Sequence, residues 1–365
     1  MHDLVVIGGG ISGLGVARAA AKRGLRGVLL EAAECSKQTS NNTLRIVHGG
    51  FRYLQSFDFV RMFKSLSDQR DILGELPAAV QPLPCVMPLN KFGMKSRVPV
   101  TAAALLYGAA LTLKGSELSW PRVVGAKYVD ATIPFLRGTA PYGALEWNDV
   151  VMTHPEMVAR YLNTEAEQDG VSVREHARVR GVARIGDSYV VTLVDGERIE
   201  ARSVVSTLGP WVNCIERPVG VSQISSLWCK GFNITVRRQI DPRHGIGVES
   251  DDRRLFFIVP RGVYSAIGTW YVPVDGPADK PTASEEELQI FIDSFNQAAP
   301  QVKLLLNDVV SVDVGVLPMV RMSAKGPVLR GNEQIRKSHR FVEVLSTKYT
   351  TFRSQGEAVV NSLLT

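Results

Sequence analysis

The sequence feature that most constrains the fold is a glycine-rich turn between a short apolar strand and a helix at the start of the chain. Residues 4–7 are continuously apolar, as in a strand buried on both faces. Gly-Gly-Gly-Ile-Ser-Gly follows at 8–13, residues 14–23 are typical of a helix with small alanines on its packing face, and 27–31 predict a second strand ending in Glu31. Together these parts predict a βαβ unit that binds a dinucleotide.

Each part of this unit has a physical role in the prediction. Gly8 makes the tight turn, Gly10 lets the backbone approach a pyrophosphate at the positive end of the helix, and Gly13 lets helix and strand pack closely. Glu31 can accept hydrogen bonds from ribose hydroxyls, and its charge would repel a 2′-phosphate. The unit therefore predicts NAD or FAD as the cofactor, with an ordinary βαβ unit that binds no ligand as the alternative.

Length and composition define the class of protein. The 365 residues suggest two domains or one large α/β domain with insertions, and 45% hydrophobic with 21% charged residues excludes disordered and fibrous chains. The longest apolar stretch, 101–113, falls short of the roughly 20 residues of a spanning helix and predicts a buried or surface-lying helix. No secretory signal is visible. Four cysteines without a Cys-x-x-Cys pair argue against a metal site or disulfide scaffold and for the reducing cytoplasm: Cys35, Cys85, Cys214 and Cys229.

Positive charge is concentrated near the end of the chain. The formal net charge is +6, and basic residues far outnumber acidic ones between positions 321 and 353. Such a cluster is either a solvated face or the rim of an anion site, since arginines suit phosphate well. Nucleic acid is not expected as a partner, because no interleaved aromatic residues or helix-turn-helix pattern accompany the charge. The basic residues are Arg321, Lys325, Arg330, Arg336, Lys337, Arg340, Lys348 and Arg353.

The rest of the chain alternates irregularly between helical and strand patterns. Between 226 and 273, strand patterns interrupted by Pro260 and Gly262 predict an antiparallel sheet that differs in kind from the first unit. The other predicted helices cover 157–168, 284–296 and 350–364, and the other predicted strands cover 171–173, 189–194, 198–201, 203–208 and 341–345.

The order of motifs along nearly the whole chain resembles that of the FAD-dependent glycerol-3-phosphate dehydrogenases, within the D-amino-acid-oxidase-like (DAO) flavoprotein superfamily. The most family-specific segment is Ile-Val-His-Gly-Gly-Phe-Arg-Tyr-Leu at 46–54. The remaining carriers are 3–13, 39–40, 208–212, 228–231, 258–260, 266–269, 315–318 and 346–353.

This resemblance implies an α/β fold of the glutathione-reductase type. A Rossmann-type FAD-binding domain would be joined to a substrate domain made of a second, antiparallel β-sheet plus helices. We expect the FAD-binding domain to be discontinuous, with residues 1–80, 145–215 and 305–365. The substrate domain would then hold residues 81–144 and 216–304.

The resemblance also implies where FAD lies. Its pyrophosphate would lie at the glycine turn, and Val179 would offer backbone to the adenine. Gly209 and the turn at 348–351 would close over the flavin, where the N-terminus of the last helix stabilises negative charge on the reduced ring. His48 is expected to contact the flavin rather than act as the general base, which the sequence does not identify. The implied FAD-binding residues are Gly8, Gly10, Ile11, Ser12, Gly13, Glu31, Thr39, Ser40, His48, Gly49, Val179, Gly209, Lys348, Tyr349 and Thr350.

The residues implied to act on the substrate are Arg52, Tyr53, Asn233, Arg330 and Lys348. Arg52 can bind a phosphate or carboxylate through two nitrogens, and Tyr53 can pack on the substrate or donate a hydrogen bond.

Two departures from the family pattern concern the substrate. Leu317 stands where the family has an arginine that binds substrate, and Asn233 stands where it has a histidine. Arg321 could replace the missing arginine or belong to a solvated face. Extra aromatic residues suggest a substrate larger or more apolar than glycerol: Phe232, Trp270 and Tyr271.

The leading hypothesis is an FAD-dependent dehydrogenase or oxidase that oxidises a CH–OH group of a small anionic substrate, such as a phosphorylated one, by hydride transfer to flavin N5. The first alternative is an FAD-dependent amine or amino-acid oxidase acting on a C–N bond, and the second is a flavoprotein without catalysis. Quinone and oxygen both stay open as electron acceptors. We expect a cytoplasmic protein without a transmembrane span, and peripheral contact with a membrane stays open.

Overall fold

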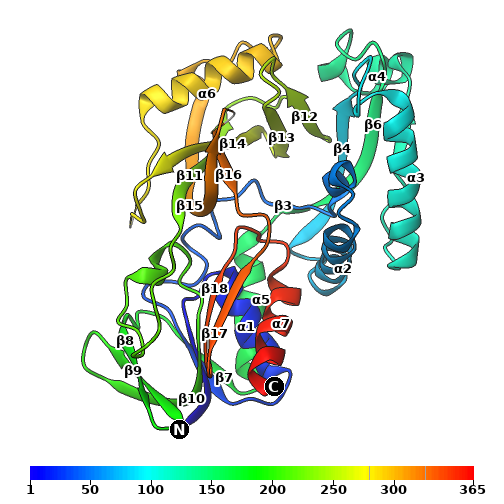
Figure 1. Ribbon diagram of the computed structural model, residues 1–365. Helices are drawn as coiled ribbons and strands as arrows, with labels where there is room; N and C mark the ends of the chain where they lie inside the picture. Colours follow the sequence, from blue (N-terminus) through cyan, green and yellow to red (C-terminus); the bar gives the residue numbers. More distant parts are fainter. Residues whose placement is uncertain (279, 325) are drawn as a thin grey trace.

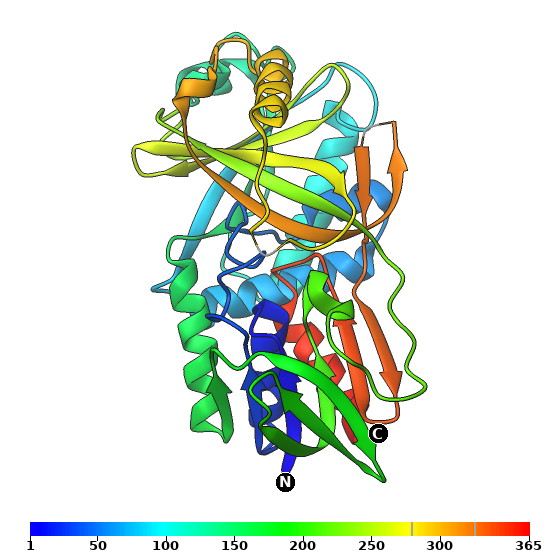
Figure 2. The same cartoon turned by 90° about the vertical axis from the view of Figure 1, so that its left-hand side faces the viewer.

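The computed structural model describes residues 1–278, 280–324 and 326–365, so Lys325 of the basic cluster lies outside the described residues. Within these residues the strands form two sheets, one above the other in Figure 1. Both chain ends lie at the far end of the first sheet (Figures 1 and 2). The chain crosses between the sheets repeatedly, so each sheet collects strands that are far apart in the sequence.

The first sheet is mainly parallel. It contains β1 (His2–Ile7), β2 (Gly27–Leu30), β7 (Val171–Arg174), β8 (Val179–Ile185), β9 (Ser188–Leu193), β10 (Arg198–Ser206), β17 (Gln334–Ser338) and β18 (Phe341–Leu345). The strand order is β17-β18-β10-β1-β2-β7, with β8 and β9 attached through β10. The strands from β18 to β7 pair in parallel, whereas β17, β9 and β8 pair antiparallel with their neighbours.

Layers on both faces of this sheet explain why β1 is apolar throughout. Leu4 and Val6 belong to a core shared with helices α1 (Ile11–Ala21), α5 (Pro155–Gln168) and α7 (Phe352–Leu364). Val5 and Ile7 pack on the other face with the β8–β9 hairpin. Because successive strand residues point to opposite faces, a strand covered on both faces needs apolar residues at every position.

The second sheet is mainly antiparallel. It contains β3 (Ile46–Val47), β4 (Val80–Pro88), β5 (Arg122–Val124), β6 (Ala144–Met152), β11 (Leu227–Val236), β12 (Gly245–Glu249), β13 (Leu255–Arg261), β14 (Tyr264–Val274), β15 (Val309–Ser323) and β16 (Gly326–Leu329). The order is β16-β15-β11-β14-β13-β12-β4-β6-β3, with β5 beside β6. Only the β12–β4 pair is parallel among the described strands of this sheet.

Helices cover the outer face of the second sheet. Helix α6 (Glu285–Ala298) begins with a capping box between Ser284 and Glu287, and its Phe291 and Phe295 pack on Phe256 of β13. The remaining helices are α2 (Phe59–Glu75), α3 (Arg97–Leu113) and α4 (Ala126–Thr132), and 3₁₀ turns cover Phe51–Ser56, Pro134–Leu136, Gly209–Asn213 and Leu306–Asp308. None of the helices in the described parts of the chain is long and apolar enough to cross a membrane.

The predicted helices and strands are confirmed in type, with one difference. The strands predicted at 198–201 and 203–208 join into the single strand β10, which pairs with β9 at one end and β18 at the other. Helix α3, expected to be buried or surface-lying, is in part both, because Tyr107 and Leu111 are buried whereas Leu105, Leu106 and Leu113 are exposed. The division into two discontinuous domains stays a prediction. Strands β6 and β15, which this division assigns to the FAD-binding domain, pair within the second sheet.

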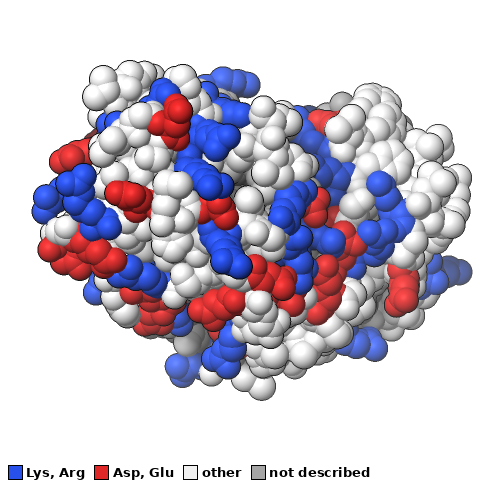
Figure 3. All heavy atoms as spheres, turned by 90° about the horizontal axis from the view of Figure 1, so that it is seen from below, with Lys and Arg blue, Asp and Glu red and all other residues white. Residues whose placement is uncertain are grey.

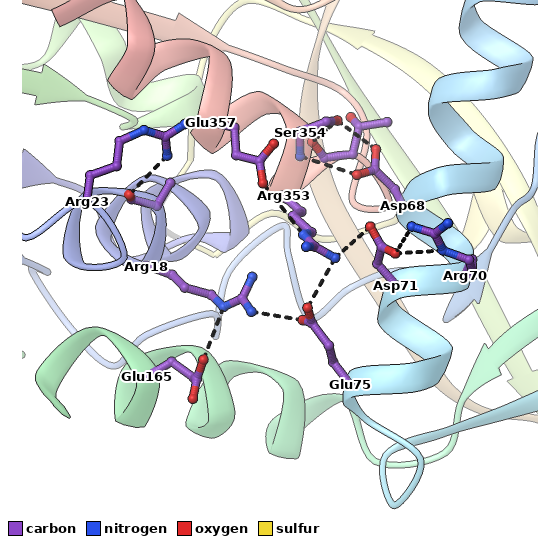
Figure 4. Close-up of polar contacts among 12 residues, drawn as sticks. Arg18, Arg23, Asp68, Arg70, Asp71, Glu75, Glu165, Arg353, Ser354 and Glu357 are labelled. Carbon is purple, nitrogen blue, oxygen red and sulfur yellow. Dashed lines mark hydrogen bonds and ion pairs between the residues drawn. The ribbon is translucent and has the colours of Figure 1, made fainter. Parts of the chain in front are cut away.

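Ion pairs tie α2 to the helices of the first sheet (Figure 4). Arg353 of α7 lies 2.6 Å from Asp71 and 3.1 Å from Glu75 of α2, and Arg18 of α1 lies 3.0 Å from the same Glu75. Arg18 also reaches Glu165 of α5 at 3.6 Å. Seen from below, acidic and basic side chains intermix over the left and centre of the view, and the upper right is mostly white (Figure 3). This face therefore carries no large patch of one charge sign.

Candidate active site

A cavity of about 1150 Å³ lies between the two sheets. It begins at the carboxyl ends of β1, β2 and β10, where open parallel sheets bind ligands, and continues along β11, β14 and β15. Its volume exceeds the roughly 300–1,000 Å³ of typical small-ligand pockets. The structure brings these predicted residues to its lining: Gly8, Gly10, Ile11, Ser12, Glu31, Thr39, Ser40, His48, Arg52, Tyr53, Val179, Gly209, Asn233, Arg330, Lys348, Tyr349 and Thr350.

Close backbone contacts fix the glycine turn. Gly8 has a φ of +100°, and a Cβ atom there would lie 2.9 Å from the carbonyl oxygen of Thr207. Gly13 does not line the cavity; a Cβ on it would lie 1.9 Å from the Gly8 oxygen, so it serves packing. The Thr207 hydroxyl lies 2.9 Å and 2.8 Å from the carbonyl oxygens of Ile7 and Gly8. Thr207 thus braces the turn, a role that the sequence did not predict.

Glu31 closes the other side of this turn. Its carboxylate accepts hydrogen bonds from the backbone N–H groups of Gly9 at 2.6 Å and Ala33 at 2.9 Å. A carboxylate has about four acceptor positions, so two remain for ribose hydroxyls. Nearby, burial and then the charges of Glu175 and Glu31 raise the pKa of the Cys35 thiol to about 12. Cys35 is therefore an uncharged packing residue.

The loop that carries Thr39 and Ser40 connects the two sheets. The Ser40 hydroxyl accepts a hydrogen bond from the Ile11 N–H at 3.0 Å, at the first turn of α1. The Thr39 hydroxyl lies 3.2 Å from the N–H and 3.3 Å from the carbonyl oxygen of Val316 in β15. The loop therefore spans from the helix N-terminus that would face a pyrophosphate to the second sheet.

His48 is held by a buried carboxylate that the sequence analysis missed. Its Nδ1 lies 2.8 Å from Oδ2 of Asp149 in β6, and Asp149 also accepts hydrogen bonds from the Gly49 N–H at 2.9 Å and the Trp147 indole N–H at 3.2 Å. Burial alone would raise the pKa of Asp149, but the charge and hydrogen bond of His48, with the Gly49 and Trp147 donors, lower it overall. Asp149 is 3% exposed whereas the His48 side chain is 52% exposed, so the pair presents His48 to the cavity.

Gly49, unlike its neighbour, does not line the cavity. Its N–H is used by Asp149, and a Cβ atom on it would lie 2.1 Å from the Tyr107 hydroxyl. Its place is thus in the packing behind His48. The sequence alone does not single out Asp149, because the same strand also contains Glu146 and Asn148.

Asn233, Tyr271 and Leu317 form part of the second-sheet wall of the cavity. The Asn233 side-chain oxygen accepts a hydrogen bond from the Thr269 hydroxyl at 2.7 Å. Arg321 does not line the cavity and stays on the exposed part of β15. Arg321 therefore does not replace the family's substrate-binding arginine, whose position is occupied by Leu317.

The prediction that Phe232 and Trp270 lie near the pocket is wrong. Both side chains pack on Phe291 of α6, on the opposite face of the sheet. Side chains alternate along β11, so Gly231 and Asn233 face the cavity and Phe232 faces away. Tyr271 is thus the member of this aromatic group that reaches the cavity.

The segment before α7 closes the cavity on the first-sheet side, and the loop after β16 adds Arg330 to the lining. Tyr349 and Arg330 line it, and the Tyr349 hydroxyl and the Arg330 Nε are buried without a hydrogen-bond partner among the described residues. Burial raises the pKa of Tyr349. Buried donors without partners are rare in proteins, so these atoms fit a polar ligand in the cavity.

Helix α7 is held in place by Asp68 of α2 (Figure 4). The carboxylate accepts hydrogen bonds from the Ser354 N–H at 3.2 Å and the Ser354 hydroxyl at 2.6 Å. Burial raises the pKa of Asp68 to about 6, although the Ser354 hydrogen bonds oppose the rise. Asp68 therefore positions the turn at 348–350 indirectly.

The parallel sheet, glycine turn, acidic second strand and large cavity against a second sheet define a dinucleotide-dependent oxidoreductase. The chain belongs to the FAD dependent oxidoreductase (DAO) family, whose model matches residues 3–342. FAD is therefore the cofactor, and the choice between NAD and FAD is settled. The predicted superfamily and enzyme class are confirmed.

Relatives support a narrower similarity. A glycerol-3-phosphate dehydrogenase of Synechocystis sp. is 28% identical over 99% of this chain and 70% of its own length. An aerobic glycerol-3-phosphate dehydrogenase of Staphylococcus aureus is 25% identical over 99% of this chain and 66% of its own length. The chain thus spans about two thirds of the length of these relatives.

Solved structures match this chain over its whole length. Glycerol-3-phosphate dehydrogenase from Bacillus halodurans, complexed with FAD, matches with a TM-score of 0.71 and 20% identity over 100% of this chain and 64% of that one. The L-α-glycerophosphate oxidase of Mycoplasma pneumoniae, with FAD bound, matches with a TM-score of 0.72 and 13% identity over 100% of this chain and 94% of that one. Glycine oxidase from Geobacillus kaustophilus matches with a TM-score of 0.70 and 17% identity over 100% of this chain and 94% of that one. At such low identities, the structural matches show a shared fold and say nothing of a shared substrate.

Proposed function

We propose that this enzyme oxidises a CH–OH group of a small anionic substrate. This is the type of reaction indicated by the names of the glycerol-3-phosphate dehydrogenases reported above. The observation that carries the proposal is the His48–Asp149 pair, which faces the same cavity as the cationic Arg52, Arg330 and Lys348. FAD, when bound, supplies the hydride acceptor. The glycine turn, Glu31 and the unpartnered Tyr349 hydroxyl are the groups that would hold it.

His48 is the proton acceptor in this proposal. An alcohol loses its hydroxyl proton when the carbon loses hydride, so a base must be within reach. In the tautomer that donates Nδ1–H to Asp149, the His48 ring has a lone pair on Nε2 that can accept a proton. Asp149 then stabilises the imidazolium that forms and fixes the ring orientation. This proposal differs from the sequence-based expectation that His48 contacts the flavin rather than acting as the general base.

The cations of the cavity would position the substrate. Arg52 is exposed to the cavity and can bind an anionic group through two nitrogens, and the unpartnered Arg330 Nε can add a donor. Lys348 supplies positive charge beside the Tyr53 ring, with Nζ 4.7 Å from the ring centroid. A neutral substrate would leave these charges uncompensated, which disfavours it.

Oxidation of a C–N bond is the second candidate, favoured by the shared fold of glycine oxidase and by Asn233 and Leu317 in place of family residues. The two candidates differ in their products. The holoenzyme is incubated with phosphorylated polyols, hydroxy acids and amino acids, with a dye, quinone or oxygen as acceptor, and products are identified by mass. A carbonyl compound without released ammonia or amine supports the proposal, and ammonia or amine release contradicts it.

We further propose a cytoplasmic enzyme that contacts membranes peripherally. The four cysteines are free thiols, as expected in a reducing compartment. Helix α3 has no charged residue between Arg97 and Lys114, and one of its faces is apolar and exposed. The side of the molecule on which α3 lies in Figure 1 shows few charged side chains when seen from below (Figure 3). Basic residues beside an apolar helix face suit an anionic lipid surface. Flotation with anionic vesicles tests this, and Leu105→Glu should abolish it; flotation unaffected by Leu105→Glu contradicts it.

A further inference from the structure

Arg61 of helix α2 lines the cavity, although it belongs to none of the motifs above. Its Nε lies 2.6 Å from Oδ2 of Asp58, and its guanidinium carbon lies 5.6 Å from the centroid of the Tyr53 ring. A Cβ atom on Gly331 would lie 2.9 Å from its Nη1, so the side chain ends at the loop after β16. Within the described residues, neither Nη atom donates a hydrogen bond. Arg61 thus keeps donors that suit an anion.

Other cations lie at the same end of the cavity. Lys348 approaches the Tyr53 ring, which Arg61 also approaches. Arg330 precedes Gly331 and has a buried Nε without a partner in the described chain. The side chains of Arg61, Arg330 and Lys348 therefore form one cationic group, which we call the α2 site.

Nearby acids compensate this charge only in part. Asp58 pairs with Arg61. Glu333 pairs with Lys64; burial would raise the pKa of Glu333, but Lys64 and, more weakly, Lys348 lower it. Arg330 forms no ion pair within the described residues. Positive charge stays in excess at the α2 site.

A separate cation lies toward the second sheet. Arg52 and Tyr271 of β14 both line the cavity. Burial raises the pKa of the Tyr271 hydroxyl, and the charge of Arg52 opposes the rise. The cavity therefore offers positive charge at two places: Arg52 toward β14, and the α2 site toward the loop after β16. A substrate with a single anionic group would satisfy one of them.

We propose that Arg61 is a substrate-binding residue and that the substrate carries two anionic groups, one on each side of its CH–OH group, as in a phosphorylated hydroxy acid. Arg52 binds one anionic group and Arg61, with Arg330, binds the other. This inference rests on the proposed function, since it concerns the same cavity. It also explains why Leu317 can stand where the family has a substrate-binding arginine: the second anionic group is bound by a residue of α2 rather than of β15.

The test compares two ligands that differ at one group. 3-Phosphoglycerate carries a carboxylate where glycerol 3-phosphate carries a hydroxymethyl group, and both share the central CH–OH and the phosphate. Affinities for the dithionite-reduced holoenzyme, which cannot oxidise either ligand, are measured by anaerobic titration calorimetry for wild type, Arg61→Gln and Arg61→Lys. Arg70→Gln is the matched control, because Arg70 lies on the same helix, pairs with Asp71 and does not line the cavity. FAD content and Tm show that each variant is folded.

We expect wild type to bind 3-phosphoglycerate at least about tenfold more tightly than glycerol 3-phosphate. Arg61→Gln should lose about ten- to a hundredfold in affinity for 3-phosphoglycerate and little for glycerol 3-phosphate, and Arg61→Lys should recover part. Equal losses for both ligands, no loss in Arg61→Gln, or no binding of 3-phosphoglycerate by wild type would each overturn the inference. A failure of the proposed function would appear differently, as flavin that no CH–OH compound reduces.

Discussion

The two walls of the cavity are built in different ways. The first-sheet wall consists largely of backbone, held by contacts that leave no room for a side chain, such as the 1.9 Å between a Cβ on Gly13 and the Gly8 oxygen. The opposite wall, formed by the second sheet, α2 and the loop after β16, consists of side chains with spare capacity, such as the Nη atoms of Arg61 and the Nε of Arg330. Backbone geometry therefore determines the cofactor, whereas replaceable side chains determine the substrate.

The largest effect is expected from filling the first-sheet wall. Gly13→Val should abolish FAD binding, because its side chain would overlap the Gly8 carbonyl and displace α1 from the turn. The measurement is the ratio of flavin to protein after purification. Gly125→Ala is the control, since nothing lies within 4 Å of a Cβ there. A yellow Gly13→Val protein with a full complement of FAD would break the distinction between the walls.

Removing the proposed base should affect catalysis but not the cofactor. His48→Asn is expected to lower the rate of anaerobic flavin reduction by about 10²–10⁴-fold while FAD stays bound. Asp149→Asn should cause a smaller loss, because the imidazole remains but loses its orienting carboxylate. Stopped-flow absorbance measures both rates. Variants that reduce flavin as fast as wild type would remove His48 from the mechanism.

Losses at Arg52 and Arg330 should depend on the charge of the substrate. Either alanine variant is expected to lose about ten- to a hundredfold in kcat/KM on an anionic substrate, and much less on its neutral analogue. Lysine should recover only part, since it keeps the charge but not the paired donors. Steady-state kinetics with both compounds gives the comparison. Equal losses on the two compounds would mean that the second wall does not recognise charge.

The smallest effect concerns pH and stability. The pKa of Asp68 is raised from 3.8 to about 6 in the folded protein, so the folded form holds the proton more tightly between these values. Its stabilisation is present below about pH 4 and is lost as pH rises through about 6. Relative to Asp68→Asn, wild-type Tm should fall by on the order of a few degrees across this range. Parallel Tm curves for the two proteins would argue against this titration.

The first-sheet wall could be predicted from sequence because it follows local rules. The turn at 8–13, the helix after it and Glu31 lie within one short stretch, and their spacing alone specifies their geometry. The second wall could not be predicted to the same extent. His48 and Asp149 are 101 positions apart and meet only because β3 pairs with β6.

Strand alternation explains the errors on the second wall. Phe232 and Asn233 are adjacent in sequence, yet one packs under α6 and the other faces the cavity. A motif identifies the strand but not the face of each residue, unless the register is known. Arg61 was missed for a related reason: a cation on a helix is ordinarily a solvated residue, and only the folded structure shows that it lines the cavity and ends beside Gly331.

The most direct test of the account is an anaerobic titration of the yellow holoenzyme with a phosphorylated alcohol and with its unphosphorylated parent, followed by flavin absorbance. The account predicts that the phosphorylated alcohol bleaches the flavin stoichiometrically, that the parent does so far more slowly, and that His48→Asn suppresses both reactions. Bleaching by an amino acid instead, or equal rates with charged and neutral alcohols, would contradict it.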